Sequence, residues 1–221
     1  MKLKYSIHNK NEQKSFYVKR KNTPYRGDDW HYHDEFELYF PMTGSGIRIV
    51  GDSMEYYGSN ELVFCGTNLP HLFKTNSEDN DHDRVVVKFS KSLIWQIIDN
   101  VPEFVKIKQL LIKSARGILY PVSKSYSLVN DFIRLSEASG ADRVIQLLNI
   151  LNRISKIDDF RLLTSDSYKN ISERIIWMSI ASAEMTKHAI NSFLACSVVF
   201  INELSSICEL TGADANEVEL G

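Results

Sequence analysis

The segment His31-Tyr-His33-Asp-Glu-Phe-Glu37, with Gly44 seven residues further on, is the most informative part of the sequence. Alternate side chains of a strand share one face, so His31, His33 and Glu37 are expected to project together from a single strand. A third histidine, His71, follows one hairpin later and can complete the set from a neighbouring strand. Imidazoles with one carboxylate suit Zn, Fe, Ni or Mn, and the same groups can instead hydrogen-bond an organic ligand. The stretch therefore predicts a polar pocket inside a β structure.

Short β-prone runs surround this stretch throughout residues 1–90. They are rich in branched and aromatic residues, and turns containing Gly, Asn or Asp separate them. The clearest runs are Glu37-Leu-Tyr-Phe-Pro, Gly46-Ile-Arg-Ile-Val, Glu61-Leu-Val-Phe-Cys and Arg84-Val-Val-Val-Lys-Phe. Several short strands with regular turns are typical of an antiparallel sandwich or barrel, which we expect over residues 1–90. Trp30 and Tyr39 are the aromatic residues expected to line its pocket.

From residue 91 onwards the apolar residues follow a helical period, so the chain is expected to belong to the α+β class. Residues 91–165 are predicted to form a helical linker or dimerisation region, and the polar residues 166–176 a junction. The remaining segment, 177–221, contains neither Gly nor Pro between Ala181 and Leu210. That run predicts one long C-terminal helix of roughly 30 residues, about 45 Å in length.

Composition and charge exclude several classes of protein. The chain has 221 residues and a net charge of −2, and residues 167–221 carry three basic side chains against seven acidic ones. A segment that grips phosphates should be basic, so we do not expect this chain alone to bind DNA. The longest apolar stretch, Ala189 to Ile201, is shorter than the roughly 20 residues that span a bilayer. Three cysteines lie outside any metal-binding spacing, so we expect a cytoplasmic protein without membrane contact.

The opening stretch resembles the first motif of cupin barrels, which has the pattern His-x-His, three residues, Glu, six residues and Gly. The second cupin motif is matched less well, because Phe64 stands at the expected Pro and His71 falls five residues after Gly66 instead of three. The resemblance implies an antiparallel jelly-roll barrel. Its pocket would hold either an organic ligand without metal or a divalent metal on His31, His33, Glu37 and His71. A metal-dependent cupin enzyme is therefore one alternative function.

A longer resemblance covers about residues 15–175. It is carried by the opening stretch, by Gly44-Ser-Gly-Ile-Arg-Ile-Val-Gly-Asp, by Asn60-Glu-Leu-Val-Phe-Cys-Gly-Thr-Asn-Leu-Pro-His, by Ala115-Arg-Gly-Ile and by Arg143-Val-Ile-Gln-Leu-Leu-Asn-Ile-Leu. Together these segments are similar to the sensor half of AraC-type transcription regulators. The resemblance implies a barrel that binds a sugar or related small metabolite, and helices that form a homodimer or pass the signal on. Such regulators continue into helix-turn-helix units, and no basic recognition helix follows Ile175 here.

Residues 177–221 resemble a different family, the UDP-glucose/GDP-mannose dehydrogenases, at the start of the central domain. The matching segments are Ala183-Glu-Met-Thr-Lys-His-Ala-Ile-Asn-Ser-Phe-Leu-Ala, Phe200-Ile-Asn-Glu-Leu and Cys208-Glu-Leu-Thr-Gly-Ala-Asp-Ala-Asn-Glu-Val. In that family the long helix builds the dimer, and the residues matching Lys187 and Asn191 lie in the active site. A dehydrogenase fragment fused at the C-terminus is thus a further alternative.

The other parts of a dehydrogenase site are missing from the sequence. There is no Gly-rich strand-to-helix turn for NAD, and Cys196 and Cys208 lie in the predicted helix rather than in a Gly-rich setting. We therefore expect no NAD binding and no enzymatic activity, and we expect Lys187 and Asn191 to be exposed polar positions on a docking helix.

Overall fold

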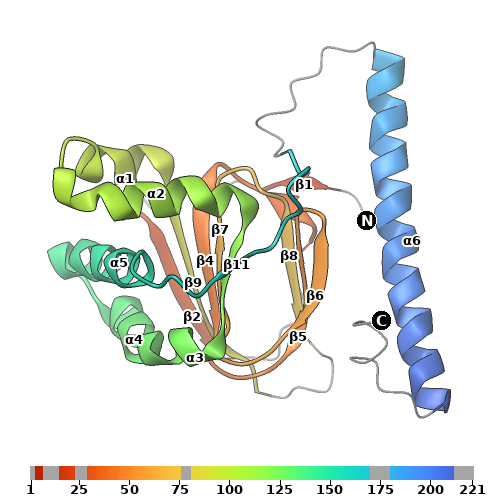
Figure 1. Ribbon diagram of the computed structural model, residues 1–221, viewed down its shortest axis with the longest axis horizontal. Coiled ribbons are helices and arrows are strands. Elements are labelled where there is room, and N and C mark those ends of the chain that lie inside the picture. Colours follow the sequence, from red (N-terminus) through yellow and green to blue (C-terminus); the bar gives the residue numbers. More distant parts are fainter. Residues whose placement is uncertain (1–2, 7–14, 23–28, 76–80, 170–179, 212–221) are drawn as a thin grey trace. The chain divides into compact units, whose positions relative to one another are not determined.

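The computed structural model describes residues 3–6, 15–22, 29–75, 81–169 and 180–211 (Figure 1). Its contacts divide the chain into two units. One unit runs from Lys4 to Ile175, and the other consists of Met1–Leu3 with Ile176–Gly221.

Two β-sheets form the framework of the first unit. The five-stranded sheet has the order β1 (Lys4–Tyr5), β3 (His31–Tyr32), β8 (His71–Thr75), β5 (Gly46–Val50) and β6 (Ser53–Tyr57). The six-stranded sheet has the order β11 (Arg161–Leu162), β10 (Ile118–Tyr120), β7 (Leu62–Cys65), β4 (Glu35–Pro41), β9 (Asp83–Ser90) and β2 (Tyr17–Asn22). Neighbouring strands are antiparallel apart from β1 and β3. This α+β architecture is compatible with the predicted cupin barrel.

Helices cover the outer face of the six-stranded sheet (Figure 1). They are α1 (Lys91–Ile98), η1 (Pro102–Phe104), α2 (Val105–Lys113), η2 (Ser114–Arg116), α3 (Val122–Ser125), η3 (Tyr126–Leu128), α4 (Val129–Glu137) and α5 (Gly140–Ile154). Their apolar stripes pack on Phe36, Leu38 and Phe40 of β4, with Phe40 and Phe132 only 4.6 Å apart between ring centroids. Burial of such side chains stabilises the fold by about 1.5–3 kcal/mol each.

Strand β4 is buried along its whole length because both of its faces are covered. Its alternate residues Glu37 and Tyr39 point away from the helices. Tyr39 packs in a second core cluster with Val63, Cys65 and Phe73, which come from both sheets. The space between the sheets is therefore apolar at that cluster and polar near Glu37, and this arrangement positions the candidate site.

The stretch His31–Glu37 is not the single strand that its alternation predicted. Strand β3 ends at Tyr32, β4 begins at Glu35, and the two strands belong to different sheets. The chain bends at His33 and Asp34 and there passes from one sheet to the other, as strands do at the corners of packed sheets.

Residues 91–165 were predicted to be helical, but they also contain two strands, β10 and β11. Gly117 ends the helical segment with a φ of +65°, a conformation that favours glycine. Ile118–Tyr120 then pairs with β7 and extends the six-stranded sheet.

The second unit contains α6 (Ile180–Thr211), a helix of 32 residues. Several of its large apolar side chains are exposed, including Met185, Phe193, Phe200 and Leu210. Among the described residues, no helix has the length and apolar character required to cross a membrane. Of the predicted junction 166–176, residues 170–176 lie outside the described residues, as do 177–179 and 212–221 of the C-terminal segment.

Candidate functional site

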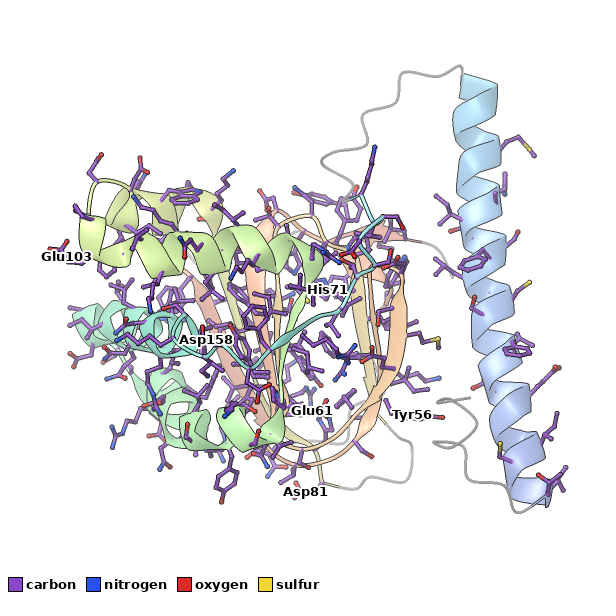
Figure 2. The ribbon with its side chains drawn as sticks, in the orientation of Figure 1. Tyr56, Glu61, His71, Asp81, Glu103 and Asp158 are labelled. Carbon is purple, nitrogen blue, oxygen red and sulfur yellow. The ribbon has the colours of Figure 1, made fainter. Side chains whose placement is uncertain are left out.

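Four buried side chains meet between the two sheets: His31, His33, Glu37 and His71. Their potential ligand atoms all lie within 4.8 Å of one another. Nε2 of His33 lies 2.9 Å from Oε2 of Glu37, and Nε2 of His71 lies 3.2 Å from the same oxygen. Each of the four residues is at most 6% exposed. Figure 2 shows His71 among the side chains that fill the barrel.

Both sheets contribute to this cluster. His31 and His71 are direct partners in the pairing of β3 with β8, and their ring centroids lie 4.5 Å apart. Glu37 comes from β4 of the other sheet, and His33 from the bend that joins β3 to β4. The bend therefore brings His31, His33 and Glu37 together, as a single strand was expected to do.

The proton on each imidazole is fixed by backbone carbonyl groups. Nδ1 of His31 lies 2.7 Å from the carbonyl oxygen of Asp29, and Nδ1 of His33 lies 3.0 Å from that of Glu35. Nδ1 of His71 lies 2.8 Å from that of Leu69. A carbonyl oxygen only accepts, so every Nδ1 must donate its hydrogen. A neutral ring then has a lone pair on Nε2. In His33 and His71 that lone pair faces the carboxylate, so a proton or a metal ion is needed between them.

Lys88 supplies positive charge to the same cluster. It is the partner of Glu37 in the pairing of β4 with β9, and its Nζ lies 2.9 Å from Oε2 of Glu37. Burial alone would raise the pKa of Glu37, but the charges of Lys88 and His71 and the hydrogen bonds from His33 and His71 hold it well below its usual value. Burial, together with neighbouring His71, lowers the pKa of His31 to about 4. The cluster is thus a buried carboxylate held ionised by the groups around it.

A cavity of about 340 Å³ adjoins the cluster. Its walls include Tyr17, Lys21, His31, Tyr39, Arg84 and Lys88. Arg84, Val86 and Lys88 alternate along β9 and so share the face that carries Glu37 and Tyr39. Edge strands β1 and β2 contribute further wall residues. Because His31 belongs to both and Lys88 of the wall contacts Glu37 of the cluster, the cavity and the cluster form one continuous site.

A chain of hydrogen bonds leads from Arg84 to Tyr39, and both of these residues line the cavity. Nη1 of Arg84 donates to Nδ1 of His82 at 3.2 Å, so the His82 hydrogen is on Nε2, which lies 3.1 Å from the hydroxyl of Tyr57. That hydroxyl lies 3.3 Å from the hydroxyl of Tyr39. Since His82 must donate to Tyr57, Tyr57 can donate to Tyr39. The network fixes the orientation of two groups that a ligand would meet.

The remaining predicted site residues have different positions. Tyr39 lines the cavity, and its ring stacks on Phe73 at 3.7 Å between centroids. Trp30 is buried, but it does not line the cavity in the described part of the chain. Asn191 lies half-buried on α6, and the side chain of Lys187 lies outside the described residues.

The sequence reasoning missed Lys21, Arg84 and Lys88. A signal for two of them was present, because the alternation in Arg84-Val-Val-Val-Lys88 places both charged side chains on one face of a buried strand. A charge on the inner face of a buried strand needs a partner or a ligand.

Comparison with known proteins gives a match to a dehydrogenase family and a likeness in fold to solved structures. Residues 181–221 match the UDP-glucose/GDP-mannose dehydrogenase family, central domain. UDP-glucose 6-dehydrogenase YwqF of Bacillus subtilis (strain 168) is 57% identical over 42 residues, which are 19% of this chain and 10% of that protein. UDP-glucose 6-dehydrogenase of Rickettsia bellii (strain RML369-C) is 24% identical over 139 residues, 63% of this chain and 31% of the relative. The chain spans about a tenth of the length of the first curated relatives it matches.

Among solved structures, the AraC-like transcriptional activator CuxR is similar in fold, with a TM-score of 0.50 and 10% identity over 74% of this chain and 59% of that one. The inferred resemblance to the dehydrogenase central domain is confirmed over residues 181–221, and the inferred resemblance to AraC-type regulators is confirmed in fold.

Proposed function

We propose that the unit Lys4–Ile175 is the ligand-sensing domain of an AraC-type transcription regulator and binds a sugar or related small metabolite. The observation that carries this proposal is the cavity beside the buried cluster, into which His31, Tyr39 and Lys88 project. The cavity volume falls in the range of about 300–1,000 Å³ that is usual for small-molecule sites. The fold shared with an AraC-like activator supports the same function.

The polar groups of the site are oriented before any ligand arrives. Backbone carbonyls fix His31, Glu37 holds Lys88, and the chain from Arg84 through His82 fixes Tyr39. A site with groups held in place binds more tightly, because less conformational freedom is lost on binding. Helices α1, α2, α4 and α5 pack on the outer face of the sheet that contributes β9, so a ligand bound at Lys88 can be sensed by the helices.

Thermal denaturation with added compounds tests this proposal. A ligand present at 100 times its Kd stabilises a protein by about 2.7 kcal/mol, which raises the midpoint of unfolding by several degrees. We expect a member of a panel of sugars, sugar acids, sugar phosphates and organic acids to raise the midpoint, and His33→Ala or His71→Ala to abolish the rise. No shift with any compound or metal would count against a sensor.

A metal-dependent cupin enzyme is the second candidate, and a specific observation favours it. Three imidazoles, each with Nδ1 bound to a carbonyl oxygen, and one carboxylate bring their potential ligand atoms within 4.8 Å of one another, and this is a donor set that divalent metals accept. His31, His33, Glu37 and His71 would hold such an ion, which supplies Lewis-acid chemistry when bound. Lys88 already provides a cation at Glu37, and for this reason we prefer the sensor without metal.

Elemental analysis of the purified protein separates the two candidates. The sensor predicts metal well below one equivalent per chain, with no uptake after addition of Fe, Mn, Ni or Zn. Stoichiometric metal that is lost in His33→Ala would instead favour the enzyme.

The second unit adds a proposed homodimer contact through the exposed apolar side chains of α6. We propose no hydride-transfer activity for this segment, and NAD reduction assayed with UDP-glucose should remain at background.

A cytoplasmic location is also proposed. It is supported by the thiols of Cys65, Cys196 and Cys208, which form no disulfide.

A further inference from the structure

We propose that the ligand of the cavity carries a negative charge, as a carboxylate or phosphate group, and that Lys21, Arg84 and Lys88 bind this group. This inference rests on the proposed sensor function and names the class of its effector. A sugar acid or sugar phosphate fits it, and so does another small organic anion, whereas a neutral sugar does not.

The charge of the cavity wall is the first observation. In the described part of the chain, the wall contains four lysine or arginine side chains and one carboxylate, that of Asp29, and one of the four, Lys88, also pairs with Glu37 of the cluster. The carboxylate of Asp29 is bound to Nζ of Lys4 at 2.5 Å. Arg84 and Lys88 are 2% and 5% exposed, so their charges act in a region from which water is largely excluded. Coulomb interactions are stronger there than in bulk water.

The arrangement of the basic residues is the second observation. Arg84 and Lys88 lie on one face of β9, separated by Val86, and Lys21 of β2 is the direct partner of Arg84. Cross-strand partners have Cβ atoms about 5 Å apart, so Lys21 and Arg84 can contact the same anionic group. Contacts to His82 at Nη1 hold the guanidinium of Arg84 in place. A planar guanidinium matches the paired oxygens of a carboxylate or phosphate.

The hydrogen-bonding capacity of the wall is the third observation. Lysine and arginine only donate, whereas each hydroxyl of a neutral sugar both donates and accepts. The lysine and arginine side chains of the wall can therefore accept no hydrogen from a neutral sugar, whose hydrogens would have to be accepted by the hydroxyls of the wall. An anionic group only accepts, so it is complementary to Lys21, Arg84 and Lys88, and the tyrosine hydroxyls can bind the rest of the molecule.

The test compares compounds that are matched except for one charged group, and it measures them by thermal denaturation and by calorimetric titration of the full chain. The matched sets are glucose with glucuronate and glucose 6-phosphate, and hexanol with hexanoate, with inorganic phosphate as the control for a bare anion. We expect charged members to raise the unfolding midpoint and neutral members to leave it unchanged. Comparison of glucuronate and hexanoate with glucose 6-phosphate then distinguishes carboxylate from phosphate ligands.

Three lysine variants test which side chains bind the anion. Lys88→Met should weaken binding of the best anion by about 10-fold or more, because a hydrogen bond to a charged group is lost. Lys21 lies on the edge strand β2, and Lys21→Gln should weaken binding by about 2–5-fold. Lys74→Gln removes the same charge from the exposed face of β8 and should bind as the wild type does.

Two results would overturn the inference alone: a neutral compound that binds as tightly as its charged partner, or wild-type affinity for the anion in both Lys21→Gln and Lys88→Met. Both outcomes would leave a sensor in place. If no compound of either kind shifts the midpoint, the sensor and the inference fail together.

Discussion

The ammonium nitrogen of Lys88 lies 2.9 Å from Oε2 of Glu37, across the paired strands β9 and β4. Both side chains are almost completely buried. Burial of a single charge is costly, and each of these two charges is tolerated because the other is present. The pair also joins the histidine cluster to the cavity, since Lys88 lines the cavity and Glu37 contacts two imidazoles.

Removal of one partner should therefore lower the free energy of unfolding far more than removal of both. Lys88→Met is expected to lower the free energy of unfolding by about 3–5 kcal/mol, because Glu37 remains as a buried carboxylate. The double variant with Glu37→Gln should lose less than the sum of the two single variants. Urea denaturation at pH 7 measures all three, and Lys74→Gln serves as the exposed control. Additive losses would show that the pair does not interact.

The ion pair that joins β6 to β11 should make stability depend on pH. Burial would raise the pKa of Glu55, but hydrogen bonds from Arg161 and Arg48 outweigh it and lower the pKa to about 2. A depressed carboxyl pKa stabilises the fold above the unfolded value near 4.5, and the contribution is lost as the pH falls toward 2. The contribution stays below about 3 kcal/mol, because Arg161 is partly exposed and water screens the pair.

Comparison of the wild type with Glu55→Gln measures this contribution. In urea denaturation at pH 7 the variant should be less stable, and the difference should shrink between pH 4.5 and pH 2 as Glu55 of the wild type becomes protonated. A difference that stays constant over this range would contradict the assigned pKa.

Gly44 allows His82 to reach the hydrogen-bonded chain. Its φ is +86°, and a Cβ at this position would lie 2.4 Å from Cδ2 of His82. Gly44→Ala should lower the free energy of unfolding by about 1–3 kcal/mol through backbone strain, with a further loss from displacement of His82. Gly140→Ala is the matched control, because its φ is +53° and nothing lies within 4 Å. Equal losses in the two variants would show that contact with His82 has no effect.

The exposed apolar side chains of α6 predict self-association. Phe193 and Phe200 are 72% and 64% exposed, and a spacing of seven residues places them on one face of the helix. Light scattering over a range of concentrations should give a dimer for the wild type and a monomer for Phe193→Glu with Phe200→Glu. Ala195→Glu adds a charge on a different face and should remain dimeric. A wild-type chain that stays monomeric would contradict the proposed contact.

Local pattern was sufficient to predict much of the barrel. The run Gly46–Val50 forms β5, and the helical period predicted from residue 91 onwards is present in α4, which buries Phe132 and Leu135, because turns and periodicity are encoded within a few residues. Strand β10 was not predicted, because three residues are too few to show a period. The sheet change at His33 was not predicted either, because the alternation continues across the bend.

The candidate site was predictable only where its residues are close in sequence. The motif gave His31, His33 and Glu37, and the next histidine along the chain, His71, joins them in the structure. Lys88 reaches Glu37 through the register of β4 with β9, and Lys21 reaches Arg84 through the register of β2 with β9. The alternation in Arg84–Lys88 could have placed these two charges on one face, but register between strands that are distant in sequence depends on the whole fold, so their partners Lys21 and Glu37 could not be read from local pattern.

We propose above all that a small molecule binds between the two sheets, beside the buried cluster. The most direct test of this proposal is a crystal structure of the chain with the compound that raises the unfolding midpoint most. We predict density for the compound in the cavity, with an anionic group within hydrogen-bonding distance of Nζ of Lys88. A compound bound on the outer surface, or imidazoles of His31 and His33 that face bulk solvent, would contradict the account.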